Sequence, residues 1–173
     1  MTLAELLVAL AGFALAAAAA LTVLESGQRA WAFGAARVEA QQSGRAALDR
    51  LAAEIRNAGY GGTAFDAVTV AGRETIVLQH DLDGDGRIGP TRERVTWRLA
   101  GSILRRDAGG GAQPVINGVS AFALTYFDGA GAPTTIPAAV RLVEIVLVTR
   151  PEYSVPGSTV ATVWSTRARI RNR

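Results

Sequence analysis

The fold is decided by residues 1–25, which read MTLAELLVALAGFALAAAAALTVLE. Between Glu5 and Glu25 lie 19 residues without a charge. As a helix with a rise of about 1.5 Å per residue, this run spans roughly 28 Å, close to the ~30 Å hydrocarbon core of a bilayer. A cleavable secretory signal would need a basic segment in front of the apolar run, and none precedes Glu5. We therefore expect a membrane-spanning helix or the core helix of a bundle.

Glu5 is the unusual residue of this segment. An unpaired carboxylate at membrane depth costs ~2.5–3.5 kcal/mol. Glu5 therefore either sits at the headgroup boundary or pairs with a cation inside an assembled bundle. Because the nearest side-chain cation along the chain is Arg29, the expected partner is an α-amino group, such as that of a neighbouring copy.

Helical spacing continues after the apolar run. Opposite charges stand four residues apart in three pairs, Glu25–Arg29, Arg45–Asp49 and Arg50–Glu54. A sparser apolar stripe that could pack on a sheet consists of Val38, Leu48, Leu51 and Ile55. Gly59 then provides a helix C-cap. The pattern predicts one helix from about residue 2 to about residue 58.

After residue 60 the apolar pattern changes to a period of two. Strands are predicted in four ranges, 94–99, 122–126, 140–149 and 160–170, with glycine-rich turns at 107–112 and 128–132. A long helix followed by antiparallel strands is typical of the α+β class. We expect a hydrophobic helix over 1–25, an amphipathic continuation over 26–60 and a β-sheet domain over 61–173.

The composition excludes many kinds of catalysis. All 18 basic residues are arginine, cysteine is absent and His80 is the single histidine. Lysine-dependent phosphate loops and Schiff bases, thiol nucleophiles, cysteine-ligated metals and Ser-His-Asp triads all need residues that are missing or too few. We therefore do not expect an enzyme.

Residues 80–88, HDLDGDGRI, are the best candidate for a metal site. EF-hand-type calcium loops supply ligands from positions 1, 3 and 5 and from a backbone carbonyl at 7, with glycine at 6. Asp81, Asp83 and Asp85 fit the first three positions, Gly86 fits the sixth, and Arg87 would offer its carbonyl. The prediction is a structural calcium ion.

The match to a calcium loop is incomplete. Position 12 is Arg92, and Glu93 comes one residue late. The alternative is an acidic hairpin loop built from Asp-Gly turns, in which Arg87, Arg92 or Arg94 folds back to screen the carboxylates. His80 is a poor calcium ligand and is expected at a strand end.

The C-terminal segment carries alternating arginines, namely Arg167, Arg169, Arg171 and Arg173. In an extended chain all four lie on one side. A solvated edge strand, protected from further pairing by its charge, is the favoured interpretation. Pairing with acids of a neighbouring subunit or with an anionic surface is the alternative. Nucleic-acid binding is not expected, because the pattern is short and has no aromatic residue beyond Trp164.

Residues 1–9, MTLAELLVA, resemble the mature N-terminus of type IV pilin-like proteins, in which Phe or Met, Thr, Leu and an aliphatic residue precede a signature glutamate. Residues 45–60, RAALDRLAAEIRNAGY, resemble the helix end of W-type minor pilins and of J-type minor pseudopilins of type II secretion. The resemblance extends through the acidic loop and the strands after it. The chain departs from many major pilins at Thr22, which replaces a helix-kinking proline, and in lacking cysteines for a C-terminal disulfide.

The resemblance implies a pilin-like fold and a role in assembly. In this family a prepilin peptidase removes a basic leader and methylates the new N-terminus, here Met1. Glu5 then neutralises the N-terminus of an adjacent subunit. The implied partners are other pilin-like subunits, in a homo- or heteropolymer, and the peptidase. The subunit would occupy the inner membrane, with a periplasmic domain, before it joins a filament at the cell surface or across the periplasm.

The expected function is therefore that of a structural subunit of a type IV pilus-like or type II secretion pseudopilus filament, in a minor, initiating or tip position. Two alternatives stay open. One is the major subunit of an extracellular filament. The other is a monomeric, membrane-anchored calcium-binding domain.

Overall fold

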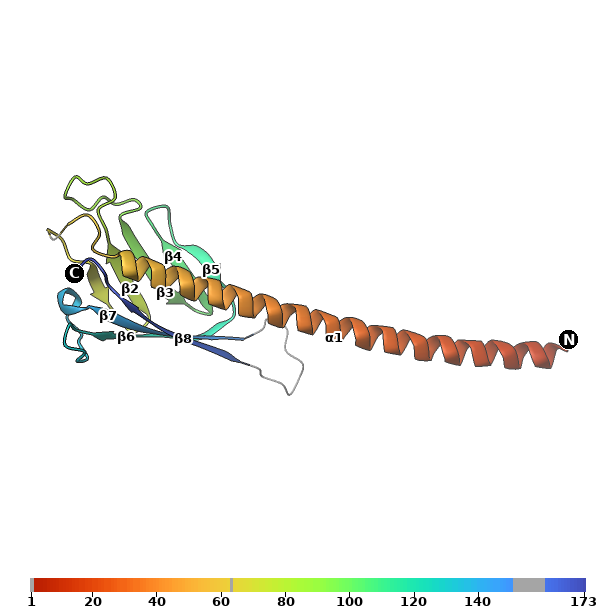
Figure 1. Ribbon diagram of the computed structural model, residues 1–173. Coiled ribbons are helices and arrows are strands. Elements are labelled where there is room, and N and C mark those ends of the chain that lie inside the picture. Colours follow the sequence, from red (N-terminus) through yellow and green to blue (C-terminus); the bar gives the residue numbers. More distant parts are fainter. Residues whose placement is uncertain (1, 63, 151–160) are drawn as a thin grey trace. The chain divides into compact units, whose positions relative to one another are not determined.

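The computed structural model describes residues 2–62, 64–150 and 161–173. The chain forms one long helix followed by antiparallel strands, which confirms the predicted α+β class (Figure 1). The elements are α1 (Leu3–Asn57), β1 (Val68–Ala71), β2 (Thr75–Gln79), β3 (Arg94–Ala100), β4 (Ile103–Asp107), β5 (Gln113–Ile116), β6 (Val119–Phe127), the 3-10 turn η1 (Pro137–Ala139), β7 (Leu142–Thr149) and β8 (Thr162–Arg169). The chain divides into two compact units, Met1–Val38 and Glu39–Arg173.

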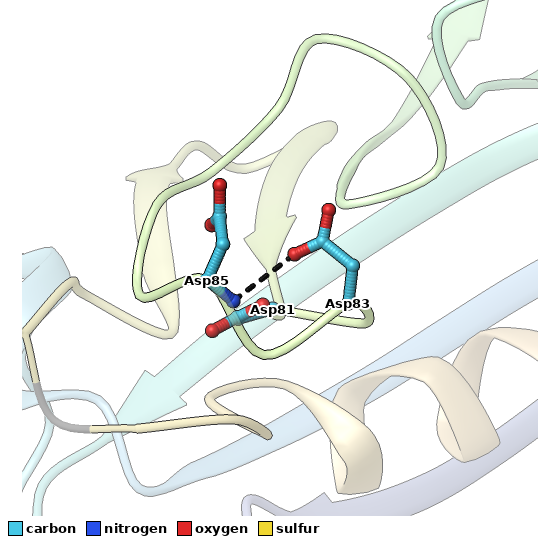
Figure 2. Close-up of side chains that lie close together, drawn as sticks. All are labelled: Asp81, Asp83 and Asp85. Carbon is cyan, nitrogen blue, oxygen red and sulfur yellow. Dashed lines mark hydrogen bonds between the residues drawn. The ribbon is translucent and has the colours of Figure 1, made fainter.

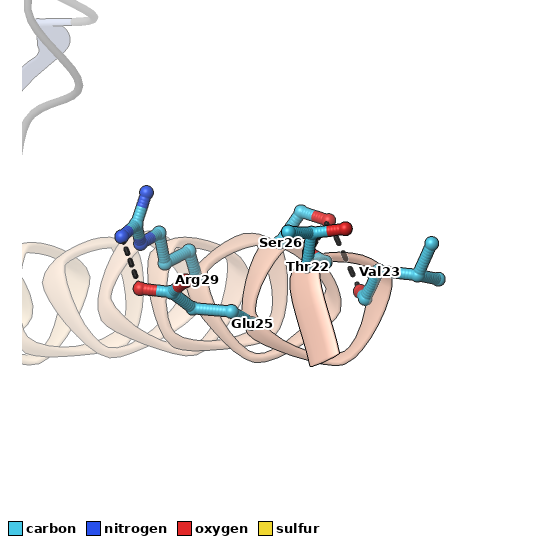
Figure 3. A network of polar contacts seen from close by, with 5 residues as sticks. All are labelled: Thr22, Val23, Glu25, Ser26 and Arg29. Atoms are coloured by element: carbon cyan, nitrogen blue, oxygen red, sulfur yellow. Dashed lines mark hydrogen bonds and ion pairs between the residues drawn. The ribbon is translucent and has the colours of Figure 1, made fainter. Parts of the chain in front are cut away.

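The first unit is the N-terminal part of α1. Its most apolar stretch has a mean hydropathy of 2.4 and no buried residue, so α1 is long and apolar enough to cross a membrane. The helix continues through Thr22, whose hydroxyl donates a hydrogen bond to the Ala19 carbonyl at 2.7 Å. One turn later the Ser26 hydroxyl donates to the Thr22 carbonyl, and Arg29 pairs with Glu25 (Figure 3). A charge pair therefore follows the uncharged run.

In the second unit, the C-terminal part of α1 packs on the strands. The buried positions of α1 are spaced three or four residues apart and begin at Gly44, followed by Ala47, Leu48, Leu51, Ala52 and Ile55. Val38, which we expected in this stripe, is 52% exposed, so that part of the prediction is wrong. The packed face of α1 begins only at Gly44, where the helix comes close to β8, so Val38 precedes the part of the helix that packs on a sheet. A Cβ atom at Gly44 would lie only 2.7 Å from Nε1 of Trp164 on β8.

The strands form two sheets where we expected one. The first contains β1 to β5 in chain order, and the second contains β6, β7 and β8. The chain turns between them at Gly118, whose φ of +70° favours glycine. The Arg150 N–H donates to the Gly118 carbonyl at 2.8 Å and fixes this turn to the end of β7. The predicted strand ranges correspond to β3, β6, β7 and β8, although Val160 lies outside the described residues.

Glu54 connects α1 to the first sheet. Its Oε2 accepts a hydrogen bond from Nε1 of Trp97 on β3 at 2.5 Å. Its Oε1 accepts one from Nε of Arg106 on β4 at 2.7 Å. Trp97 is fully buried, whereas the side chains of Glu54 and Arg106 keep 17% and 21% of their surface exposed. The pair predicted within the helix, Arg50–Glu54, is longer at 3.5 Å. A charged hydrogen-bond acceptor thus fixes the helix on the sheet.

Candidate functional site

Two groups of predicted site residues lie in different units, and the first is the start of α1. The Glu5 N–H donates to the Thr2 hydroxyl at 3.3 Å, and the Thr2 N–H donates to Glu5 Oε2 at 2.9 Å. This reciprocal arrangement is a capping box, which satisfies two N–H groups that a helix start otherwise leaves free. Glu5 therefore has a partner within its own chain, in addition to the alternatives considered from the sequence.

Thr2 is a residue that the sequence analysis missed. The signal was present, because Thr followed three residues later by Glu ahead of an apolar run is the capping-box pattern. Met1, the residue expected to be processed and methylated, lies outside the described residues.

The second group is the acidic loop, residues 80–93, which connects β2 to β3. These strands pair antiparallel, with Gln79 opposite Arg94. The His80 N–H donates to the Glu93 carbonyl at 3.0 Å, so the loop closes on itself at its base. His80 is half-buried and follows β2 directly, in agreement with the predicted strand-end position.

Asp81 is the buried member of the aspartate trio, with 1% of its surface exposed. Its Oδ1 accepts from the Gly84 N–H at 2.6 Å and its Oδ2 from the Gly86 N–H at 2.9 Å. The Gly86 N–H, supported by that of Gly84, holds the pKa of Asp81 below its ordinary value of 3.8, although burial opposes this. Asp81 is therefore an ionised carboxylate around which the loop turns.

Asp83 and Asp85 are exposed and lie beside Asp81 (Figure 2). The Asp85 N–H donates to Asp83 Oδ1 at 3.1 Å, and the Arg87 N–H donates to Asp85 Oδ1 at 2.7 Å. The Asp85 N–H lowers the pKa of Asp83, but desolvation and the charges of Asp85 and Glu93 outweigh it, so the pKa of Asp83 is raised. The like charges in this loop are thus only partly compensated.

Glu93 holds both sides of the loop, a role that the sequence analysis did not assign. It is 6% exposed. Its Oε1 accepts from the Leu82 N–H at 2.8 Å and the Asp83 N–H at 3.3 Å, while its Oε2 accepts from the Gly89 N–H at 2.7 Å. The Gly89 and Leu82 N–H groups hold the pKa of Glu93 below its ordinary value of 4.5, despite burial.

The three aspartates fit a hard cation. Each offers a carboxylate oxygen, and these three atoms lie within 4.8 Å of one another. Oxygen ligands of calcium lie 2.3–2.6 Å from the ion, so two on opposite sides of it are about 5 Å apart. Although Asp81 already accepts two hydrogen bonds, each carboxylate oxygen has a second lone pair. The three aspartates can therefore hold a metal, and the carbonyl of Arg87 as a further ligand stays a prediction.

The alternative of arginine screening is not seen among the described residues. Their ion pairs do not include Asp81, Asp83 or Asp85. Arg87 and Arg92 are exposed, and each contributes its backbone N–H to a hydrogen bond.

Two of the four alternating arginines lie in an edge strand as expected, whereas Arg171 and Arg173 follow the end of β8. β8 is at the edge of the second sheet, where Arg167 and Arg169 are exposed and Ala168 between them is buried. Arg167 donates to Glu144 of β7 at 2.9 Å.

A comparison with models of protein families gives no match for this chain, and neither does a comparison with curated proteins. The family resemblance of residues 1–60 therefore stays a prediction.

Proposed function

We propose that this chain is a structural subunit of a type IV pilus-like or type II secretion pseudopilus filament, in a minor, initiating or tip position. The observation that carries the proposal is the division of α1. The described residues before Gly44 contain no buried side chain, whereas Gly44 to Ile55 pack on the chain's own sheets. The exposed part needs lipid before assembly and other subunits after it, since its apolar side chains are unfavourable in water.

Glu5 is the residue that gives this helix a preferred partner. In the single chain its carboxylate caps the helix start through Thr2. In a filament it would neutralise the α-amino group of a neighbour, and the attraction between a carboxylate and an ammonium group is stronger in an apolar bundle than in water. The capping contact thus reduces the cost of holding Glu5 in the membrane before that pair forms.

The test is filament assembly in cells that carry the chain's own export and assembly system. Glu5→Ala is compared with Glu39→Ala, the same substitution at an exposed helical position. We expect Glu5→Ala subunits to fold and reach the membrane but to be missing from sheared filaments. Glu39→Ala subunits should be present at the wild-type level.

A third variant separates pairing between subunits from capping. Thr2→Ala removes the hydroxyl that caps the Glu5 N–H but leaves the carboxylate in place. If pairing matters, Thr2→Ala assembles. Normal filaments from Glu5→Ala would contradict the role of Glu5, and a wild-type chain found in no filament would contradict the whole proposal.

We also propose that the acidic loop holds a structural calcium ion. The proposal is supported by the three carboxylate oxygens within 4.8 Å of one another. Bound calcium would stabilise the folded domain by mass action. Thermal unfolding of the full chain in detergent should therefore shift upward by a few degrees at millimolar calcium, as expected of a weak extracellular site.

The control for this measurement is Asp128, whose Oδ1 accepts two backbone N–H groups in a loop of similar Asp-Gly chemistry. Asp83→Asn should abolish the calcium shift, while Asp128→Asn should keep it. An equal calcium-dependent shift of the unfolding temperature in both variants, or no shift in the wild type, would contradict a calcium site in this loop and favour an acidic turn without a metal.

A further inference from the structure

Five arginines surround one hollow in the second unit. The hollow has a volume of about 590 Å³ and is lined by Arg56, Arg167, Arg169, Ile170, Arg171 and Arg173. Arg56 comes from the last turn of α1, and the others come from β8 and the residues after it. We call this site the arginine hollow.

The fold fixes the arginine hollow in place. Ile170 is buried, and the Ile170 N–H donates to the Arg141 carbonyl at 2.9 Å, so the chain after β8 stays on the sheet. The Arg171 N–H then donates to the Arg56 carbonyl at 3.2 Å, which brings this segment against the end of α1. The Arg173 guanidinium donates to the carbonyls of Gly62 and Phe65. These contacts hold the segment after β8 against the end of α1.

Most of this charge has no carboxylate beside it. Among the described residues, Arg167 alone of the five forms an ion pair, with Glu144 at 2.9 Å. The remaining cations repel one another, and the repulsion is strong where they share a concave surface. Helix-end stabilisation accounts for Arg56 and protection of an edge strand accounts for Arg169. Neither accounts for their convergence on one hollow.

Guanidinium groups bind carboxylates in bidentate pairs. The same unit carries exposed carboxylates of that kind, Asp83 and Asp85, whose described hydrogen bonds come from backbone N–H groups and not from arginine side chains. Each copy of the chain therefore brings one cationic hollow and one anionic loop. When two different patches of one chain are complementary, the contact is heterologous, and repeating it produces a ring or, where the rotation does not close, an open helical polymer.

We propose that the arginine hollow binds the acidic loop of a second copy of this chain, through Asp83 and Asp85. This inference rests on the proposed function, since a filament brings copies side by side. It adds a contact between globular domains to the contacts of the N-terminal helices. Because the arginine hollow binds an acidic loop and not another hollow, all subunits of the filament would have the same orientation relative to their neighbours.

The experiment reverses charge on each side in the full-length chain and measures sheared filaments with calcium chelated, because a calcium ion on Asp83 and Asp85 would compete with the arginines. The hollow reversal is Arg169→Glu with Arg171→Glu, and the loop reversal is Asp83→Arg with Asp85→Arg. We expect each reversal alone to reduce filaments at least tenfold. Both reversals in one chain should restore filaments to within about twofold of wild type.

The matched control is Arg73→Glu with Arg98→Glu, which changes the charge by the same amount at exposed positions outside the hollow and the loop. It should assemble normally. Thermal unfolding of each variant checks the fold, and Arg169→Gln with Arg171→Gln replaces the hollow reversal if that variant is unfolded. These neutral variants should also lower filament yield.

Three outcomes overturn the inference: assembly unaffected by either reversal, a combined variant no better than the single reversals, or loss with the hollow reversal alone, which would indicate another anionic ligand. In all three, wild-type filaments still form and Glu5→Ala still blocks them, so the proposed function stands. Wild-type filaments that form with calcium but not after its chelation would also overturn the inference, whereas absence of wild-type filaments under both conditions would contradict the proposed function.

Discussion

Replacing Glu54 by alanine tests how α1 is fixed on the first sheet. The change removes the acceptor of the Trp97 indole N–H and of the Arg106 guanidinium. Trp97 is fully buried, so water cannot replace the lost acceptor. An unsatisfied buried donor costs about 1–3 kcal/mol. We therefore expect most of the destabilisation to come from Trp97.

The remaining contributions are smaller. Arg106 keeps 21% of its side chain exposed and can hydrogen-bond to water, so its ion pair with Glu54 adds no more than about 1 kcal/mol. The loss of a partly buried methylene adds up to ~0.8 kcal/mol, and the higher helix propensity of alanine returns a few tenths. The net expectation is a loss of about 2–4 kcal/mol, a large part of the 5–15 kcal/mol typical of a domain.

Urea unfolding of the full chain in detergent, followed by tryptophan fluorescence, measures this loss. Glu39→Ala is the control for the same substitution on an exposed face of α1, and it should change the free energy of unfolding by less than ~0.5 kcal/mol. Glu54→Gln keeps one oxygen acceptor and should cost about half as much as Glu54→Ala.

A double-mutant cycle isolates the hydrogen bond. Trp97→Phe removes the indole donor, and Trp164, which packs at Gly44, still reports unfolding. We expect a coupling energy between Glu54 and Trp97 of about 1–2 kcal/mol. A coupling below ~0.5 kcal/mol, or a Glu54→Ala loss equal to that of Glu39→Ala, would refute the reasoning.

Two further predictions concern a helix glycine and the acidic loop. Gly44→Ala should lower the free energy of unfolding by about 1 kcal/mol, because overpacking against Trp164 outweighs the gain in helix propensity. Gly34→Ala, with no atom within 4 Å of the new Cβ, should show only the stabilisation from higher helix propensity. Equal effects of the two substitutions on urea unfolding would contradict this. Because the pKa of Glu93 is lowered in the folded chain, its stabilisation of the loop is complete above its ordinary value of 4.5 and is lost as pH falls through the lower folded value. In the wild type, hydrogen-exchange protection of the Leu82 and Gly89 amides should decrease over the same pH range. The Glu93→Gln variant should show little protection of these amides at any pH, and a variant that loses protection over the same pH range as the wild type would contradict this.

The helix could be predicted closely because its signals are local. An uncharged run, charges spaced by four and a terminal glycine are all read within a few turns, and α1 ends at Asn57, next to the expected residue 58. The packed face was predicted less well, since Gly44, Ala47 and Ala52 carry little hydropathy and their role depends on a close approach of the sheets.

The candidate site shows the same division between local and distant signals. The aspartate trio follows from spacing alone. The position of Glu93 depends on the register of β2 and β3, which closes the loop so that a carboxylate outside the calcium pattern faces three loop amides. Likewise, Glu54 was paired with Arg50 from helical spacing, but its closer partners are 43 and 52 residues away in sequence. Strand register and the split into two sheets are non-local properties that periodicity does not contain.

The exposed apolar side chains of α1 affect which environment, water, lipid or other helices, this part of the chain prefers. Ten large apolar side chains between Leu3 and Leu24 are 52–78% exposed, and burying them is worth on the order of 10–20 kcal/mol relative to water. Hydrocarbon and the side chains of other helices satisfy them almost equally, so hydrophobicity opposes an aqueous state without distinguishing lipid from protein. For a helix already in a bilayer, the free-energy difference between lipid and a helix bundle would therefore depend on a few polar atoms, of which those of the Glu5 carboxylate come first along the chain.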